Sequence, residues 1–136
     1  MAQPGKSRYP ADLKYTKDHE WARVEGDGRV RVGVTAYAVE QLGDVTLIDL
    51  PKTGATVAAH DRFGDIESVK TVSELFAPIG GTVIEVNGEL EDRPELVNDS
   101  PYEQGWMVLL QPSDAAELGS LMDAAAYESY LGSLDH

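Results

Sequence analysis

The chain has 136 residues, and its 24 acidic side chains outnumber the 11 basic ones, so the formal net charge at pH 7 is −13. A strongly acidic protein repels phosphates and anionic lipid headgroups, which argues against direct binding of nucleic acid or of a membrane surface. Because the chain has no cysteine, it has no disulfide framework and no thiolate metal site. No apolar run approaches the roughly 18 residues of a transmembrane helix.

The charge is unevenly distributed along the chain. Residues 1–60 carry eight basic and eight acidic side chains, whereas residues 61–136 carry sixteen acids against Arg62, Lys70 and Arg93. The opening residues lack both the apolar stretch of a secretory signal and the amphipathic pattern of a transit peptide. We therefore expect a bacterial cytoplasmic protein and favour a trimmed mitochondrial form less. The length fits a single domain over residues 13–136, preceded by a flexible arm over residues 1–12.

The elements after this arm are predicted to be short strands. Residues 29–35 alternate basic and apolar side chains, which predicts a half-buried strand that pairs with residues 21–24 as a hairpin. Thr35 is expected to cap a short helix over residues 36–42 that ends at Gly43. Further strands are predicted over residues 45–50, 57–59, 63–68, 72–76, 82–86 and 106–110, between glycine and proline turns. Strands at this spacing favour a sandwich or a barrel.

The last part of the chain has a helical pattern. Asp114 and Glu117 have the spacing of a capping box, and the apolar residues at positions 127, 130, 131 and 134 follow the helical period. We predict one or two amphipathic helices over residues 114–134, packed on a β body that ends near residue 112. The fold class predicted from these patterns is mainly β, in one domain.

Catalytic constellations are absent from the sequence patterns. The three histidines are too scattered for a helical metal motif. The acidic run at residues 89–92 lacks the ligand spacing of a calcium loop and predicts a solvated face. Gly81 is not followed by the lysine of a P-loop, and Ser68 does not sit in a nucleophile elbow. Nothing in these patterns argues for an enzyme.

Lys70 is the chemically distinctive residue. It stands between the strands predicted over residues 63–68 and 72–76, and the charges near it are acidic. One interpretation is a solvated lysine in surface ion pairs, each worth about 0–1 kcal/mol. The other is the tip of a hairpin that a modifying enzyme acylates, which removes the charge. The dipeptide Val69-Lys70 lacks favoured turn chemistry, so the residues alone leave both interpretations open.

Two segments around Lys70 resemble the lipoyl-attachment signature of the glycine cleavage system H protein family. They are Gly-Asp-Ile-Glu-Ser-Val-Lys-Thr-Val at residues 64–72 and Phe-Ala-Pro-Ile-Gly-Gly-Thr-Val-Ile-Glu-Val-Asn at residues 76–87. Further matches run from Lys14-Tyr15 and His19-Glu20-Trp21 to Gly105-Trp106-Met107, so the resemblance covers nearly the whole chain. Biotin carriers usually set the lysine between methionines, and the lipoyl domains of 2-oxoacid dehydrogenases usually have Asp-Lys-Ala there.

The resemblance implies a lipoyl-domain-like flattened β-barrel, or barrel-sandwich hybrid, with short helices that include the C-terminal ones. It implies that lipoate is joined to the Lys70 amine by an amide, and that the chain is a carrier without catalytic activity of its own. Lipoate would be its only cofactor, and no metal is expected. We also expect a monomer.

The partners that the resemblance implies are three enzymes of glycine cleavage and a lipoate-attaching enzyme. The P protein, a pyridoxal-phosphate glycine decarboxylase, would load the aminomethyl group of decarboxylated glycine onto lipoyl-Lys70. The T protein, an aminomethyltransferase, would release ammonia and pass the one-carbon unit to tetrahydrofolate. The L protein, a dihydrolipoamide dehydrogenase, would then reoxidise the dihydrolipoyl group.

Three carboxylates are candidate site residues, and two of them, Glu20 and Glu74, match acidic positions of the family. Glu20, in the His-Glu-Trp motif, and Glu74, four residues after Lys70, are predicted to approach the loaded amine, because carboxylates hold ammonium groups by charge-assisted hydrogen bonds. Glu67, three residues before Lys70, is a candidate for recognition by the lipoate-attaching enzyme. Simple solvated acids are the alternative for each of them.

Two other functions remain open at this stage. The chain is alternatively a donor or store of lipoyl groups in lipoate metabolism, for which the same lysine would serve. It is alternatively an unmodified acidic binding module of β-barrel type.

Overall fold

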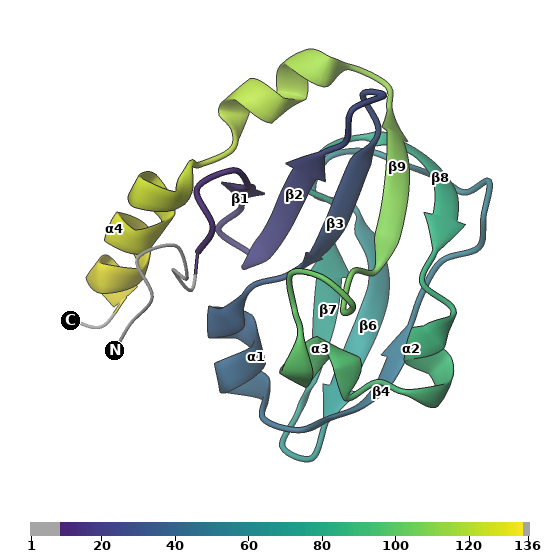
Figure 1. Ribbon diagram of the computed structural model, residues 1–136, viewed down its shortest axis with the longest axis vertical. Coiled ribbons are helices and arrows are strands. Elements are labelled where there is room, and N and C mark those ends of the chain that lie inside the picture. The colour runs from purple at the N-terminus through teal and green to yellow at the C-terminus, as the bar shows by residue number, and fades with distance from the viewer. Residues whose placement is uncertain (1–8, 135–136) are drawn as a thin grey trace.

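The computed structural model describes residues 9–134, and within that range the chain is mainly β, as the sequence predicts. Antiparallel strands form two sheets, one of six strands in the order β1-β2-β3-β9-β8-β5 and one of three in the order β4-β6-β7 (Figure 1). The strands are β1 (Lys14–Tyr15), β2 (Glu20–Val24), β3 (Val30–Val34), β4 (Val45–Asp49), β5 (Thr56–Val57), β6 (Arg62–Ser68), β7 (Val72–Phe76), β8 (Gly81–Val86) and β9 (Val108–Pro112).

The two sheets share one apolar core. Val32 and Leu110 from the larger sheet and Ile66 and Leu75 from the smaller one are each at most 2% exposed and belong to one cluster. Burying a side chain of this size stabilises a fold by about 1.5–3 kcal/mol. Because side chains alternate along a strand, the neighbours of Ile66 and Leu75 lie on the outer face of the three-stranded sheet.

The predicted β2–β3 hairpin and the helix after it are confirmed. Val24 pairs with Val30 and Glu20 with Val34. Helix α1 (Ala36–Leu42) begins where the Thr35 hydroxyl accepts a hydrogen bond from the Ala38 N–H at 3.3 Å, and it ends at Gly43. Gly43 has a φ of +77°, a conformation that favours glycine.

Two short helices were not predicted. Helix α2 (Glu89–Asp92) occupies the run expected to be a plain solvated face, and helix α3 (Leu96–Asp99) follows it. Each helix buries a leucine, Leu90 or Leu96, in the core beside β4. A helix of four residues is too short to produce a periodic pattern: α2 buries Leu90 alone, and α3 buries Leu96 and Val97.

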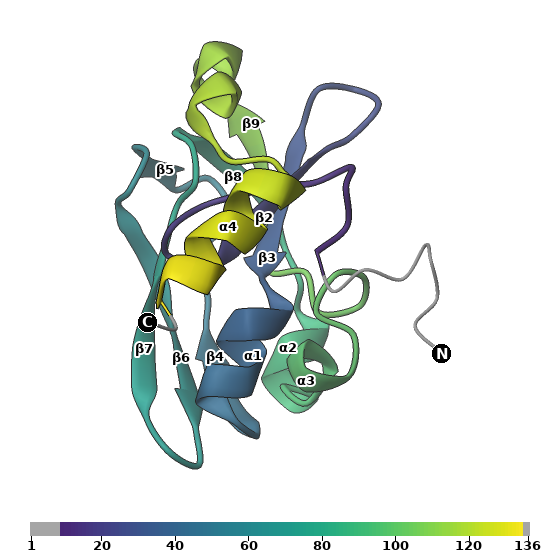
Figure 2. The same ribbon diagram turned by 90° about the vertical axis from the view of Figure 1, so that its left-hand side faces the viewer.

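The C-terminal helices are confirmed with one correction. Helix α4 (Ala124–Leu134) buries Tyr127 and lies on the same side of the sheets as α1 (Figure 2). The segment Ala115–Ser120 is a 3₁₀ helix, which Asp114 caps by accepting from the Ala116 N–H. The expected capping box is wrong, because the Glu117 carboxylate instead accepts a hydrogen bond from the Gly80 N–H at 2.8 Å.

Part of the predicted flexible arm lies outside the described residues, which begin at Tyr9. Tyr9 itself is 9% exposed, and its ring packs edge-on against Tyr127 with the centroids 5.2 Å apart. Tyr9, within the predicted arm, is therefore packed against the C-terminal helix.

The strand that was predicted over residues 106–110 begins later than expected, at Val108.

Candidate functional site

The β6–β7 hairpin holds Lys70 at its tip. Strands β6 and β7 pair up to Glu67 and Val72, and the loop is closed by a hydrogen bond from the Ser68 N–H to the Thr71 carbonyl at 2.8 Å. The Ser68 hydroxyl oxygen accepts from the N–H groups of Lys70 at 3.1 Å and Thr71 at 3.2 Å. This serine turn replaces the Asn-Gly chemistry that the sequence lacks, and Ser68 is the signal that sequence reasoning missed.

A second set of contacts fixes the base of the Lys70 loop. The Val69 N–H donates to the carbonyl of Asp44, in the loop between α1 and β4, at 3.0 Å. That loop is held by Asn98 of α3, whose amide donates to the Gly43 carbonyl at 2.8 Å and accepts from the Val45 N–H at 2.9 Å. The position of the tip therefore depends on Asn98, which lies well beyond the hairpin in the sequence.

The Lys70 side chain is exposed, and its stem passes over Gly43. A Cβ atom at position 43 would lie 3.2 Å from the Lys70 Cδ. None of the ion pairs found within residues 9–134 involves Lys70; Arg62 pairs with Asp65, at 3.1 Å from its Nε, and with Glu74, at 3.5 Å. The backbone of the loop is held by hydrogen bonds and the Lys70 amine is accessible.

A cleft of about 200 Å³ opens beside β7, which is the edge strand of its sheet. Residues from three segments line the cleft: Asp18, His19 and Glu20 at the start of β2; Ala38, Gln41 and Leu42 of α1; and Thr71–Leu75 at β7 with Val34 and Ile66 behind them. The structure thus brings Glu20 and Glu74 to one cleft that begins at the residue after Lys70. The Glu74 carboxylate, however, pairs with Arg62 on the outer face of the sheet.

Glu20 is a buried carboxyl in the wall of this cleft, only 1% exposed. One oxygen accepts from the Thr16 hydroxyl at 3.0 Å and the other from the Phe76 N–H at 3.1 Å. Burial raises the pKa of Glu20 to about 8, although both hydrogen bonds favour the ionised form and act in the opposite direction. At neutral pH the carboxyl is therefore mostly protonated.

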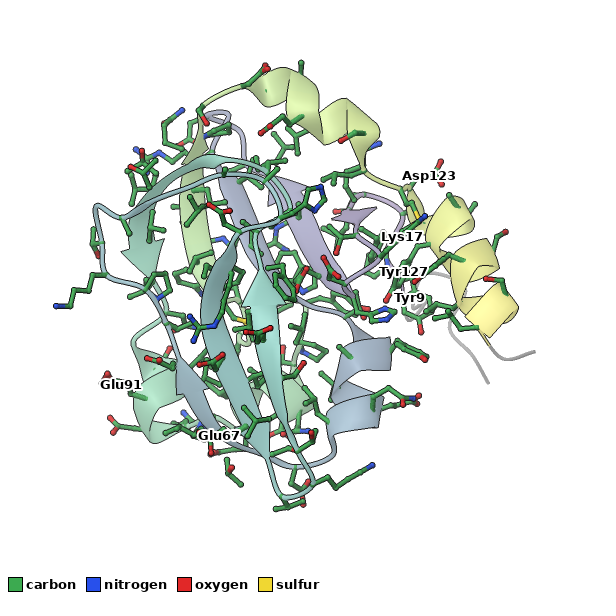
Figure 3. The ribbon with its side chains drawn as sticks, turned by 180° about the vertical axis from the view of Figure 1, so that it is seen from behind. Tyr9, Lys17, Glu67, Glu91, Asp123 and Tyr127 are labelled. Carbon is green, nitrogen blue, oxygen red and sulfur yellow. The ribbon has the colours of Figure 1, made fainter. Side chains whose placement is uncertain are left out.

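His19 lies beside Glu20 with a left-handed backbone, φ +69°. Its Nδ1 is 2.8 Å from the Tyr127 hydroxyl, which is also 2.8 Å from the hydroxyl of Thr35. Figure 3 shows Tyr127 on α4 next to Tyr9. Burial lowers the pKa of His19, so the ring adds no positive charge to the cleft at neutral pH. This link between α4, α1 and β2 connects residues too far apart for the sequence to reveal.

Because of Glu20, we expect the protein to lose stability as the pH rises from about 4.5 to about 8. In this interval the carboxyl is protonated in the folded state and ionised in the unfolded state, so unfolding releases a proton and the free energy of unfolding falls with pH. The stabilising contribution of the protonated Glu20 is fully present below the pKa that this carboxyl has in the unfolded chain. It is lost as the pH rises through the pKa that it has in the folded protein. The Glu20→Gln substitution removes the titratable carboxyl but keeps an oxygen that can accept the hydrogen bond from the Phe76 N–H.

Thermal unfolding of both proteins at about pH 5 and about pH 8 tests this expectation. The wild type is expected to lose more of its melting temperature across the interval than the Glu20→Gln variant. An equal loss in both proteins would show that Glu20 is ionised in the folded state throughout.

The exposed Lys70 amine and the adjoining cleft are suited to carrying a group. Among the described residues no group of His, Cys, Asp or Glu side chains is placed to hold a metal ion. In the same part of the chain no helix is long and apolar enough to cross a membrane. The site consists of an exposed amine on a fixed hairpin and an adjoining cleft with a buried carboxyl.

Comparison with known proteins points to one family. The family model of the glycine cleavage H-protein matches residues 13–133. The glycine cleavage system H protein of Brevibacillus brevis is 55% identical over 121 residues, which are 89% of this chain and 95% of that protein. The H protein of Bacillus subtilis is 54% identical over 119 residues, or 88% and 93% of the two chains.

A solved structure shares the fold. The crystal structure of a glycine cleavage system H protein from Mycobacterium marinum matches with a TM-score of 0.83 and 43% identity, over 90% of this chain and 98% of that one. The match confirms the lipoyl-domain-like barrel-sandwich fold with short helices that the resemblance implied. With the family model and the relatives above 50% identity, it shows that the chain belongs to the glycine cleavage H-protein family.

Proposed function

We propose that the chain carries lipoate in amide linkage to the Nζ of Lys70 and serves in this form as the carrier of aminomethyl groups in glycine cleavage. Membership of the H-protein family makes it the lipoyl carrier component of that system and not one of its enzymes. The observation that carries the assignment to Lys70 is the exposed amine at the tip of a hairpin whose backbone is fixed by Ser68 and by the Asp44 carbonyl.

The residues around Lys70 fit this prosthetic group. Acylation requires an accessible amine, and the Lys70 side chain is exposed and takes part in none of the ion pairs found in residues 9–134. Gly43 leaves room for the lysine stem, and the cleft beside β7 begins at Thr71. When bound, lipoate would supply a cyclic disulfide whose S–S bond is reduced as one sulfur takes up the aminomethyl carbon, and release of that carbon would leave a dithiol.

The residues of the cleft are proposed to receive the amine of the carried aminomethyl group and to shield it from water. Glu20 and Glu74 are the proposed contacts, Glu20 from the cleft wall and Glu74 from its border. An ammonium group next to Glu20 favours the ionised carboxyl, so Glu20 gives up its proton and forms a charge-assisted hydrogen bond. The neutral His19 does not oppose the incoming cation.

The family implies interaction with the P, T and L proteins of the system. We propose further that the loaded chain passes the aminomethyl group from P protein to T protein and presents dihydrolipoyl-Lys70 to L protein. The lipoate-attaching enzyme is proposed to recognise Glu67. The relatives named above are bacterial, which supports the proposal of a bacterial cytoplasmic protein. A monomer remains our expectation.

Reconstitution tests the proposed function. The purified chain is treated with lipoate, ATP and a lipoate ligase, its mass is measured, and it is combined with P, T and L proteins, glycine, tetrahydrofolate and NAD. We expect one lipoyl group per chain and glycine-dependent reduction of NAD. A chain that stays unmodified would support the acidic binding module instead. A lipoylated chain that supports no glycine cleavage but donates its lipoyl group to other proteins would support the donor or store.

A further inference from the structure

The outer face of the three-stranded sheet has an ordered pattern next to Lys70. Strand pairing places Leu47 of β4 opposite Glu67 of β6, and Glu67 opposite Val72 of β7, so that these three side chains form one row across the sheet. The row is the last one before the hairpin tip. Its two apolar members are 50% and 63% exposed, which is unusual for large apolar side chains in a row on a solvent face.

Most of the exposed large apolar side chains gather at this place. Among residues 9–134 there are five of them: Val69 and Val72 lie in the Lys70 hairpin, and Leu47 lies on the neighbouring strand β4 in the row that ends at Val72. The other two, Val24 and Leu134, lie elsewhere; the β2–β3 turn that Val24 precedes is at the opposite end of the molecule from the β6–β7 hairpin (Figure 1). Scattered single residues need no explanation, but a cluster beside one functional lysine indicates a contact surface.

The next row of the same face is entirely acidic. Asp49, Asp65 and Glu74 stand opposite one another across β4, β6 and β7. Like charges in directly opposed pairs destabilise a sheet, and Arg62 is paired with Asp65 and Glu74 only. A groove on this face is lined by Leu47 with Ile48 and the acids Asp49, Asp65, Glu67, Glu91 and Asp92.

An apolar centre bordered by carboxylates is complementary to an apolar patch bordered by Lys and Arg side chains. Figure 3 looks onto this face, with Glu67 labelled on β6 near the hairpin tip and Glu91 on the neighbouring helix α2. The partner that fits this surface is therefore a protein with a basic rim, and its contact has to include the hairpin tip itself.

We propose that Leu47, Val69 and Val72, with Glu67 between them, form the docking surface for the enzyme that attaches lipoate to Lys70. This inference rests on the proposed function. The attaching enzyme must bring its own active site to the lysine Nζ and therefore has to close on the tip. The enzymes that act later meet the far end of the added chain. Leu47 comes from a different strand than the attachment motif, and no sequence pattern singled it out.

The test measures lipoylation kinetics of the unmodified chain with a lipoate ligase, lipoate and ATP, comparing Leu47→Ser with the matched control Val24→Ser. The two positions are 50% and 51% exposed, so neither change is expected to alter the melting temperature much. Leu47→Ser is expected to raise KM for the chain about tenfold, the equivalent of about 1.4 kcal/mol, with kcat unchanged. Val24→Ser is expected to keep the wild-type constants.

Two further variants complete the test. Leu47→Met keeps the apolar contact and is expected to keep a wild-type KM, whereas Val72→Ser is expected to raise it as Leu47→Ser does. A wild-type KM in both serine variants would overturn the docking surface while leaving lipoylation of Lys70 intact. Failure of the wild-type chain to become lipoylated would overturn the proposed function instead.

Discussion

Lys70→Arg is expected to abolish the exchange of glycine and bicarbonate catalysed by P protein, beyond the background seen with unmodified carrier. Arginine keeps the positive charge and most of the length of lysine, but its guanidinium is always protonated and does not form the amide. The folded structure is expected to remain unchanged, because Lys70 is exposed and forms none of the ion pairs found in residues 9–134.

Lys52→Arg is the matched control for this prediction. Lys52 is also exposed, and it lies in the loop after β4 rather than at a hairpin tip. The exchange rate with this variant is expected to equal that of the wild type. Full exchange with Lys70→Arg would contradict a tethered carrier mechanism.

The predicted loss is complete because, in the proposed function, the carried group is attached to the protein only through Lys70. A group fixed to Lys70 meets each partner at a high effective concentration, provided that the carrier docks reversibly. The net charge of −13 suits docking to basic surfaces, with attraction that weakens as salt screens it. Binding and release can therefore both be fast.

Gly64→Ala is expected to have the largest effect on stability. A Cβ atom at position 64 of β6 would overlap the backbone carbonyl oxygen of Asp49 on β4, and a backbone atom cannot rotate away. Overpacking of this kind costs about 1–3 kcal/mol, and the required shift would separate the two strands that position the hairpin. Urea unfolding measures the expected decrease in the free energy of unfolding.

Gly26→Ala is the same chemical change in a place with room for it. No atom lies within 4 Å of a Cβ built at Gly26, in the turn between β2 and β3. Its stability is expected to stay within about 0.5 kcal/mol of the wild type. Equal stability of the Gly64 and Gly26 variants would show that β4 and β6 adjust without cost.

Periodicity predicted the strands well where their side chains alternate. The predicted bounds of β7, residues 72–76, agree with the structure, and β6 begins one residue earlier than expected. The one-turn helices α2 and α3 escaped prediction because the one or two apolar residues that each of them buries do not make a periodic pattern. The pairing of Glu117 with Gly80 replaced a local capping box by a long-range contact, which local spacing does not reveal.

The candidate site was predicted only in part, because the sequence shows local patterns but not the contacts between distant segments. Lys70 was identified by its surroundings in the sequence and by the resemblance, and Glu20 and Glu74 do border one cleft. The residues that hold the tip were missed: Ser68 acts through its side chain in an otherwise unfavourable turn, and Asn98 acts through the loop at Gly43–Val45. Contacts between distant segments arise only from the folded topology.

The lipoylation of Lys70 is tested most directly by peptide mapping with mass spectrometry, on protein isolated from cells supplied with lipoate. Residues 61–136 contain no lysine other than Lys70, so a modified peptide from this part of the chain identifies the site without ambiguity. We predict a Lys70 peptide that carries one lipoyl group, with every other lysine unmodified. A bare Lys70 peptide, or a lipoyl group on another lysine, would contradict the account.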